Sequence, residues 1–575
     1  MEQETTIRGL FSTDDIQFRI PHYQRAYSWE KDDQVRQFVE DLREHLQVGE
    51  GAKPYYLGHF LFESADDKCR EVRVIDGQQR LTTVVLFFHS LWRELATRKE
   101  RGEPAVAAMD PDQLWRTYVE NEGQRKLRTV SYDDDFLRTA LLRGVSQERP
   151  VTQSARRLAA AMESLAGVMS AEHKTDELLR WLELVENAVV TTYEVRSKEQ
   201  ATQIFAFQND RGKDLTKLEK LKAFLVHQVY IHSPNRLEQE AIEDVDAKFA
   251  VIYQLTEEIE SLDEDQVLGH HLTAFLAQTD NAVDLIKRRL RQLANGSFKV
   301  DWIREFCAEL RNSFQNVKRI EALQYGGAMH EQLIGDVLYL QAWGSWPLLL
   351  KLMYFHYHEL PRLDEVLRLM EITIFKWQFM KGKSANDLPR FATEYDGKLE
   401  ILLARLGDVS QRGFRGGWDF NGGLKGFLDG SSHYDLRTKY LLWKYENKRR
   451  AENRDPHLSI RQYKNDVPGQ SLDASIDHVM PQDPKEFAHS ELFRKDSLHN
   501  LGNLVLMTRG RNSSLRNSLP KEKAEELKAT TYLSQQDVAN TILKQGGWGE
   551  KEIAERKREL VQFALSYWKV GVGEI

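Results

Sequence analysis

The stretch Ser475–Gln482, SIDHVMPQ, decides the fold of the C-terminal quarter of the chain, together with Asn500–Met507, NLGNLVLM. The first stretch alternates as a short strand does, until Pro481 stops it. The second stretch predicts another strand, and the Arg-Gly pair at 509–510 predicts a turn. From Asn512 onward, a run rich in Asn and Ser predicts the start of a helix. The order predicts a compact ββα unit with polar residues at its joints.

The polar residues at these joints suit phosphodiester hydrolysis. Asp477 and His478 are adjacent, so on a strand their side chains face opposite ways, and one can hold a metal ion while the other addresses a water. A neutral imidazole acts as a base near pH 7, and a hard divalent ion stabilises the phosphate and the leaving oxygen. Asp477 and the amide oxygen of Asn512 suit Mg²⁺. Asn503, on the opposing strand, is placed to hold the tautomer of His478.

The composition of the whole chain is that of an ordinary globular protein. Its 575 residues predict two or three domains, and 41% of them are hydrophobic and 29% charged. The N-terminus lacks the apolar core of a signal peptide, and the longest apolar run, Leu81–Trp92, is too short to cross a bilayer. Only Cys69 and Cys307 are present, which excludes a disulfide framework. We expect a cytoplasmic protein with no membrane partner.

Charge is distributed unevenly along the chain. The net charge is -8, yet residues 431–575 carry 24 Lys and Arg against 20 Asp and Glu, a net of +4 that leaves -12 on the remainder. A mildly basic end on an acidic body suits a protein that meets DNA at one place. Chance scatter explains the charge equally well.

Hydrophobic periodicity outside the C-terminal segment predicts many helices and a few strands. Strands are expected over residues 55–62 and 70–75, as a hairpin, and over 187–195. Helices are expected over residues 81–97, 199–207, 215–230 and 438–450, with helical patterns also over 110–185 and 236–408. We therefore predict an α+β, predominantly helical protein, with an α/β domain over residues 1–235, a helical region over 236–430 and a C-terminal domain over 431–575.

Three further motifs point to a ligand site near the N-terminus. They are Ile20–Trp29, IPHYQRAYSW; Val74–Thr83, VIDGQQRLTT; and Asn209–Leu215, NDRGKDL. In the second motif a strand ends in Asp-Gly and a helix begins near Gln79. Backbone N–H groups at a helix start favour phosphate, and Arg80 adds a guanidinium that can grip it.

The other motifs carry groups that suit the same ligand. Arg25 and Arg211 are expected to converge on the anion, and Tyr23, Tyr27 and Trp29 offer flat faces for stacking a base. A nucleotide or a flipped base fits this set. The alternative is that DGQQR forms a capped turn whose arginines pair with acids inside the domain.

Taken together, these motifs resemble the GmrSD-type family of modification-dependent (type IV) restriction enzymes. The C-terminal pattern, Asp477-His478-x-x-Pro481, then Gly-Asn-Leu-x-Leu, then Asn512 and a Lys at 521 or 523, resembles the HNH domain of that family. The IPxYQRxYxW and DGQQRxTT motifs resemble its N-terminal domain, which is related to ParB-like nucleotide-binding domains. Ala26 stands where Pro is common, a minor departure.

The resemblance implies a role for each matching residue. His478 is the general base, oriented by Asn503, and Asp477 and Asn512 are metal ligands, with Asn517 as an alternative to Asn512. His489 and His499 lack such neighbours in the sequence and are interpreted as surface or structural residues. The nucleotide site is expected to contain Tyr23, Gln24, Arg25, Asp76, Gln78, Gln79, Arg80 and Arg211.

The implied activity is a nickase-type HNH endonuclease of restriction or anti-phage defence, similar to the single-chain nucleases SspE and BrxU. Its expected cofactors are Mg²⁺ or Mn²⁺ and an NTP, either GTP or ATP, and its expected partner is double-stranded DNA, such as phage DNA, with a homodimer where both strands are cut. Two rival functions stay open. One is a toxin-like nonspecific DNase restrained by the N-terminal domain, and the other is a sensor of modified DNA that does not cleave.

Overall fold

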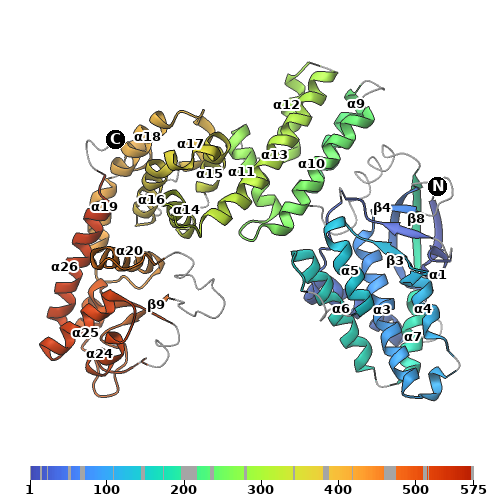
Figure 1. Cartoon of the computed structure of the whole chain (residues 1–575), viewed down its shortest axis with the longest axis horizontal. Helices are drawn as coiled ribbons and strands as arrows, with labels where there is room; N and C mark the ends of the chain where they lie inside the picture. The colour runs from blue at the N-terminus through green and yellow to red at the C-terminus, as the bar shows by residue number, and fades with distance from the viewer. Residues whose placement is uncertain are drawn as a thin grey trace. The chain divides into compact units, whose positions relative to one another are not determined.

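The structure, a computed structural model, divides into two compact units, Met1–Gly269 with Thr279–Gln315 and His270–Gln278 with Asn316–Ile575 (Figure 1). It describes residues 2–12, 16–22, 24–48, 53–64, 71–107, 109–143, 149–172, 174–195, 216–233, 238–277, 281–294, 296–340, 344–379, 387–417, 419–458, 474–508, 515 and 517–570. Within these ranges no helix is both long and apolar enough to cross a membrane.

A mixed six-stranded sheet, in the order β1-β8-β3-β4-β2-β7, forms the framework of the first unit. Its strands are β1 (Glu2–Thr6), β2 (Gln17–Arg19), β3 (Tyr56–Ser64), β4 (Glu71–Asp76), β7 (Leu127–Arg128) and β8 (Val189–Val195). The predicted hairpin is confirmed, because β3 and β4 pair antiparallel. The strand predicted over residues 187–195 is confirmed as β8, which runs parallel to β3.

Besides a short antiparallel pair, β5 (Glu120–Asn121) with β6 (Gln124–Arg125), the first unit contains helices. They are α1 (Ile7–Leu10), α2 (Arg36–Val48), α3 (Gln78–Glu100), α4 (Pro111–Tyr118), α5 (Ser131–Arg143), α6 (Gln153–Ala171), α7 (Thr175–Glu186), α9 (Lys217–His232), α10 (Glu238–Glu258) and α12 (Ala282–Gln292), while α11 (Glu264–Leu276) and α13 (Ser297–Leu323) are divided between the units. The helix predicted over 199–207 lies outside the described residues.

Helix α3 is the central element of the hydrophobic core of the first unit. Residues Leu81–Leu91 of this helix are buried all round, as expected for a helix that neighbours cover on every side, and α4, α6 and α7 lie beside it (Figure 1). Gly77 precedes α3 with φ +86°, and a Cβ there would lie 2.4 Å from the ring of Phe60. Only glycine fits this turn, so the Asp-Gly break sets where α3 begins.

The second unit contains the rest of the helical middle and the C-terminal segment. Its helices are α14 (Met329–Tyr339), α15 (Ser345–His356), α16 (Asp364–Phe379), α17 (Leu388–Glu394), α18 (Leu399–Arg412), α19 (Phe420–Leu428), α20 (Leu436–Asn453), α22 (Glu491–Phe493), α24 (Pro520–Lys528), α25 (Leu533–Gln545) and α26 (Glu550–Tyr567). The predominantly helical α+β class is thus confirmed, whereas the division into three domains stays a prediction.

A buried polar network joins the middle helices to the C-terminal segment. Glu371 on α16 is fully buried and accepts hydrogen bonds from Tyr440 on α20 (2.7 Å) and Trp568 after α26 (2.8 Å). Lys444 on α20 pairs with Asp336 on α14, and both side chains are nearly inaccessible. Removing one partner from such a network would leave a buried charge uncompensated. Buried polar contacts, in addition to apolar packing, therefore connect helices α14, α16, α20 and α26.

The C-terminal segment contains the predicted pair of strands, β9 (Ala474–His478) and β10 (Leu504–Thr508), which pair antiparallel with His478 opposite Leu504. The second strand is shorter than predicted, because Leu501–Asn503 forms a 3₁₀ turn. Asn500 caps that turn by accepting from Gly502 N (3.1 Å), which competes with strand pairing. Most of the region where the helix after Asn512 was predicted lies outside the described residues, and α24 is the next long helix.

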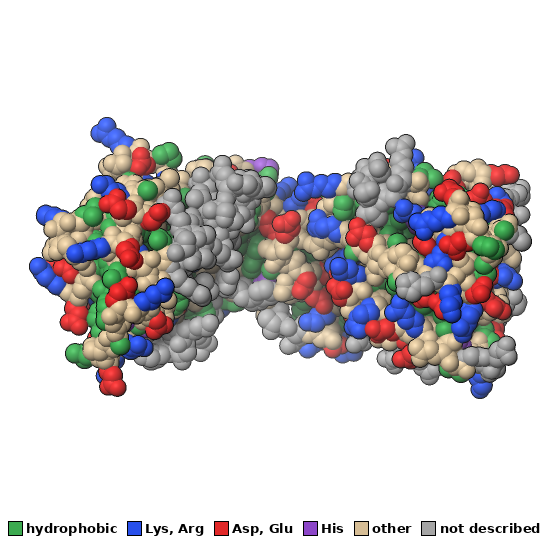
Figure 2. All heavy atoms as spheres, turned by 90° about the horizontal axis from the view of Figure 1, so that it is seen from below, with side chains coloured by type: hydrophobic (Ala, Val, Ile, Leu, Met, Phe, Trp, Pro, Cys, Tyr) green, Lys and Arg blue, Asp and Glu red, His purple; other side chains and the backbone are tan. Residues whose placement is uncertain are grey.

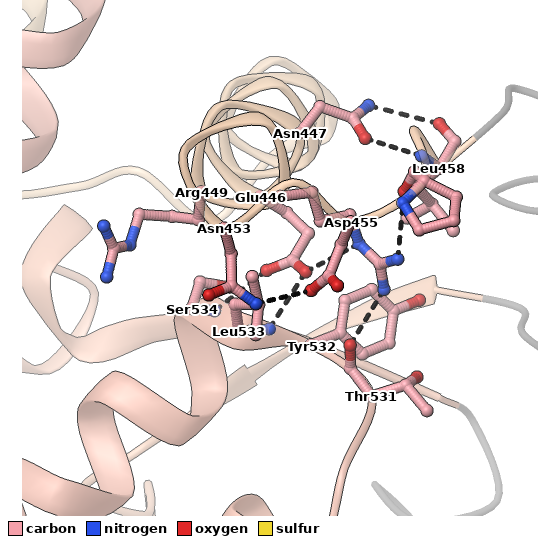
Figure 3. Close-up of polar contacts among 12 residues, drawn as sticks. Glu446, Asn447, Arg449, Asn453, Asp455, Leu458, Thr531, Tyr532, Leu533 and Ser534 are labelled. Atoms are coloured by element: carbon pink, nitrogen blue, oxygen red, sulfur yellow. Dashed lines mark hydrogen bonds and ion pairs between the residues drawn. The ribbon is translucent and has the colours of Figure 1, made fainter.

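Helix α20 is hydrogen-bonded to the start of α25 (Figure 3). The buried carboxylate of Glu446 accepts from Leu533 N (3.0 Å) and Ser534 N (2.9 Å), where a negative charge is favourable at the start of a helix. Arg450 pairs with the same carboxylate (2.9 Å). Asn447 holds Leu458 through two hydrogen bonds with its backbone, so the chain leaving α20 is anchored before it reaches β9.

Substitution of Gly502 should destabilise the C-terminal segment. A Cβ at Gly502 would lie 1.9 Å from the carbonyl oxygen of Ile553, which is backbone and cannot rotate away. We expect Gly502→Ala to lower the free energy of unfolding by about 1–3 kcal/mol, as overpacked sites do. Gly547→Ala is the control, because no atom would lie within 4 Å of a Cβ at that position. Equal thermal unfolding midpoints for the two variants would contradict the close packing of α26 on this turn.

Candidate functional site

Asp477 is held in a buried ion pair at the end of β9. Its Oδ2 accepts from Lys523 Nζ (2.8 Å), and the same ammonium group donates to the carbonyl oxygen of His478 (2.6 Å). The Lys523 side chain is fully buried and that of Asp477 is 8% exposed. Burial raises the pKa of the Asp477 carboxyl, and the nearby ammonium group partly offsets the rise. Helix α24 thereby anchors both the predicted metal ligand and the backbone of the predicted base.

The imidazole of His478 lies among three side chains, those of His499, Gln482 and Tyr434. Its Nε2 is 3.0 Å from His499 Nδ1, and its Nδ1 is 3.1 Å from Gln482 Nε2. Tyr434 stacks on the ring with 4.9 Å between centroids. Burial, together with the nearby His499 and Lys523, lowers the pKa of His478 to about 3. The ring is therefore neutral near pH 7, which is the form that accepts a proton.

Asn503 contacts the backbone around the site rather than the imidazole. Its side chain is inaccessible; Oδ1 accepts from Met480 N (2.8 Å), and Nδ2 donates to Met480 O (3.1 Å) and Leu498 O (2.8 Å). The prediction that Asn503 holds the tautomer of His478 is therefore corrected. Asn503 precedes β10, so its amide reaches the turn that follows His478 and holds that turn closed.

His499 is a site residue that the sequence interpretation missed. The sequence alone assigns it to the surface or to a structural role, whereas its ring contacts both His478 and Tyr434. The antiparallel pairing of the two predicted strands could have predicted that His499 lies near His478. Residues just before β10 must lie beside residues just after β9, and that places 499 near 478–482. His489, in contrast, contacts Pro481 O (2.7 Å) and stacks on Phe493, in agreement with a structural role.

The metal ligands predicted in this segment are only partly described. Asp477 supplies a carboxylate, Asn512 lies outside the described residues, and the alternative Asn517 is exposed. Within the part of the chain that the structure describes, no group of three or more His, Cys, Asp or Glu is arranged to hold a metal ion. A carboxylate and an amide oxygen are donors for a hard cation such as Mg²⁺, so the chemistry of the pair fits that ion.

In the first unit, the structure brings two of the three N-terminal motifs together. Gln24 Nε2 donates to Ile75 O (3.1 Å), and Gln79 accepts from Ser28 N (2.8 Å) while it donates to Ala26 O (3.0 Å). The loop over residues 20–29 is thereby fastened to the turn between β4 and α3. Both predicted ligand residues, Gln24 and Gln79, use amide groups to hold this loop. Tyr23 and the third motif, with Arg211, lie outside the described residues.

Each described arginine of the predicted nucleotide site has its own acidic neighbour. Arg25 Nε lies 3.0 Å from Glu219 Oε1 on α9, whereas Arg80 NH2 donates to His59 O (2.8 Å) and lies 3.8 Å from Asp76 Oδ2. Gly58 has φ +117°, and a Cβ there would lie 2.3 Å from Arg80 NH1. The guanidinium of Arg80 therefore crosses the backbone of β3 at its glycine. This pairing agrees with the alternative that arginines neutralise internal acids, and both side chains are only partly buried.

A small cavity of about 10 Å³, enough for about one water, lies between the 20–27 loop and the start of α3, with Arg25, Gln78 and Gln79 in its lining. Gln78 Oε1 is buried there and has no hydrogen-bond partner among the residues that the structure describes. The prediction that Tyr27 stacks on a base is wrong. Its side chain is 5% exposed and its hydroxyl hydrogen-bonds with Thr83 (2.9 Å), so the ring belongs to the core.

The face drawn in Figure 2 carries no separate basic or acidic patch over the described residues. Lys and Arg side chains are interspersed there with Asp and Glu over the described residues. A basic stripe would raise the local concentration of a nucleic acid, and this face carries mixed charge instead. The buried sites, rather than the surface charge, therefore carry the functional argument.

Two family models match the chain. The N-terminal domain of GmrSD restriction endonucleases matches residues 7–226, and the C-terminal domain of GmrSD restriction endonucleases matches residues 423–563. No curated protein shows a significant match. The first match covers the sheet apart from β1, together with the loop over residues 20–29 and the turn before α3, and the second covers α20, both C-terminal strands and Lys523.

Substitution of Lys523 should lower the stability of the C-terminal segment. Lys523→Met leaves the Asp477 carboxylate buried without its cation, so we expect the free energy of unfolding to fall by about 3–5 kcal/mol. Adding Asp477→Asn should restore part of this loss, because the uncompensated charge is removed. Lys521→Met, on the exposed side of α24, is the control. Urea unfolding measures the series, and an unchanged midpoint for Lys523→Met would contradict the ion pair.

Proposed function

The chain belongs to the GmrSD family of restriction endonucleases, and we propose that it cuts DNA at a one-metal HNH-type centre built on His478, under control of an NTP bound in its N-terminal unit. Restriction nuclease activity, and DNA as its target, follow from membership of the family. The metal ion, the nucleotide and the cutting of one strand at a time belong to the proposal.

The observation that carries the proposal is the buried imidazole of His478 beside Asp477 at the end of β9, with His499 and Gln482 at hydrogen-bond distance from its two ring nitrogens. Hydrolysis requires a base that takes a proton from water as the water oxygen attacks phosphorus. The phosphorus–oxygen bond to the leaving strand then breaks, and the leaving oxygen takes a proton. His478 can serve as the base, and the ion pair of Asp477 with Lys523 keeps the backbone of β9 in place during the reaction.

Asp477 and Asn512 are the proposed ligands of Mg²⁺ or Mn²⁺. When bound there, the cation would neutralise the phosphate and stabilise the leaving oxygen. Lys523 donates to Oδ2 of Asp477 and so holds that carboxylate in a defined orientation. One such centre hydrolyses one strand, so a single protomer should nick DNA. A double-strand break would need two protomers, as in a homodimer.

The proposed NTP site lies where the 20–29 loop meets the start of α3. The positive end of a long helix, the guanidinium of Arg80 and Gln78 Oε1, which has no partner among the described residues, support it. The proposed nucleotide is GTP or ATP. We propose that hydrolysis of the nucleotide couples the modification state of DNA, such as phage DNA, to cutting.

His478→Ala should abolish DNA cleavage while the chain stays folded. General-base catalysis contributes about 10²–10⁴-fold in rate, and the loss should reach that range. His489→Ala is the matched control, because that ring contacts Pro481 O and Phe493 instead of the proposed centre. Plasmid nicking in Mg²⁺ measures both variants, with circular dichroism to check the fold. Full cleavage by His478→Ala would refute the assignment.

The same assay, run on several DNAs, separates the proposal from its rivals. The panel contains unmodified DNA, DNA with glucosylated hydroxymethylcytosine and phosphorothioate DNA, each with GTP, ATP or no nucleotide. Cutting that depends on both modification and nucleotide supports a regulated restriction enzyme. Equal cutting of every DNA without nucleotide would favour the toxin-like DNase, and binding without cutting in any metal would favour the sensor.

Arg80→Ala should slow NTP hydrolysis by about 10- to 100-fold, because a hydrogen bond to a charged group contributes about 1.5–3 kcal/mol. The chemistry at His478 should be unaffected. Arg73→Ala on β4 is the control; its guanidinium lies 3.6 Å from Glu63 and is 36% exposed. Release of phosphate from GTP and ATP provides the measurement. NTP turnover at the wild-type rate in Arg80→Ala would argue against contact with phosphate.

A further inference from the structure

Both ring nitrogens of His478 have a side-chain partner, and the two partners together define its tautomer. Gln482 Nε2 lies 3.1 Å from His478 Nδ1, and an amide nitrogen can only donate. Nδ1 must therefore carry the lone pair. A neutral imidazole has a single proton, which then resides on Nε2 and is donated to His499 Nδ1 at 3.0 Å.

The position of His499 is fixed by contacts of its own. His433 N donates to its carbonyl oxygen (2.9 Å), and its ring lies 5.9 Å from the ring of Tyr434. The hydroxyl of Tyr434 donates to Ile476 O (3.2 Å), so strand β9 holds the ring that covers both histidines. The segment before α20 therefore contacts both the backbone and the ring of His499, whose Nδ1 lies beside His478.

We propose that His499 is the positioning residue that holds His478 as the Nε2–H tautomer, with the Nδ1 lone pair directed to the attacking water. This inference rests on the proposed nuclease function and deepens it. Asn503, whose amide is occupied by backbone groups, does not have this role. Gln482 is exposed, so its amide can leave Nδ1 and let a water take its place.

In this mechanism, the proton of the attacking water and the proton taken by the leaving oxygen each have a defined route. The water gives its proton to Nδ1 of His478 as its oxygen bonds to phosphorus, and the bond to the leaving oxygen breaks. The imidazolium that forms keeps its Nε2–H hydrogen bond to His499, which stabilises it. The proton on Nδ1 then passes to solvent, and the leaving oxygen takes a proton from water. Without His499 the ring can turn or carry its proton on Nδ1, where it cannot accept another.

Three substitutions of His499 test this with cleavage kinetics on the full chain in Mg²⁺. His499→Asn puts an acceptor oxygen near the place of Nδ1, His499→Gln puts it near the place of Nε2, and His499→Leu supplies none. We expect kcat to fall by about 10- to 100-fold in the Leu and Gln variants, as for lost partners of catalytic groups, with KM for DNA unchanged. The Asn variant should retain most of kcat. Equal losses in the Asn and Leu variants, or a change confined to KM, would overturn the proposal.

A measurement that needs no cleavage keeps the inference separate from the proposed function. Two-bond ¹H–¹⁵N spectra of the full chain with ¹⁵N-labelled histidine report the tautomer of each ring, and His478→Ala identifies the signal of His478. We expect the Nε2–H form in the wild type and in His499→Asn, and a mixture in His499→Leu. An Nδ1–H form in the wild type would refute the role of His499. Absence of cleavage with the expected tautomer would refute the nuclease centre alone.

Discussion

The hydrogen bonds from the buried Lys523 ammonium to Asp477 and to the backbone of His478 are the contacts on which the rest of the C-terminal site depends. A buried cation is costly unless it is paired and hydrogen-bonded, so α24 can pack on β9 only in the arrangement that satisfies it. Because side chains alternate along a strand, turning Asp477 toward α24 turns His478 the other way. The base therefore faces His499, Gln482 and Tyr434 rather than the core of the domain.

The N-terminal unit uses neutral amides in the same way. Gln24 and Gln79 fasten the 20–29 loop to the turn before α3, and each satisfies backbone groups that burial would otherwise leave unpaired. Gln24 and Gln79 thus hold the backbone of the proposed site in place without a ligand. The second unit adds a connection of its own, since Glu371 on α16 binds side chains from α20 and from the end of α26. These buried polar contacts join α16 directly to α20 and to the residue that follows α26.

Local patterns predicted the elements well where one face of the element is buried. The hairpin of β3 and β4, the helix after Gly77 and the strand β8 all follow from alternation, a glycine turn or a long apolar run. The pattern over residues 500–507 failed at its start, because Asn500 caps a turn that competes with strand pairing. Tyr27 was assigned to a ligand because it lies in a motif, yet its neighbours in space make it part of the core.

The sequence by itself determined that Asp477 and His478 face opposite sides of a strand, because the period of two depends only on the local backbone. It also determined the turn at Gly77, since an Asp-Gly pair ends the alternating strand pattern just before the helical pattern begins. Only the tertiary structure decided what each side chain meets. That Lys523 pairs with Asp477, that His499 rather than Asn503 contacts His478, and that Arg25 and Arg80 have different acidic neighbours all depend on strand register and helix packing. Strand register and helix packing are fixed by the burial of side chains from segments far apart in the chain, and a local sequence pattern does not contain this information.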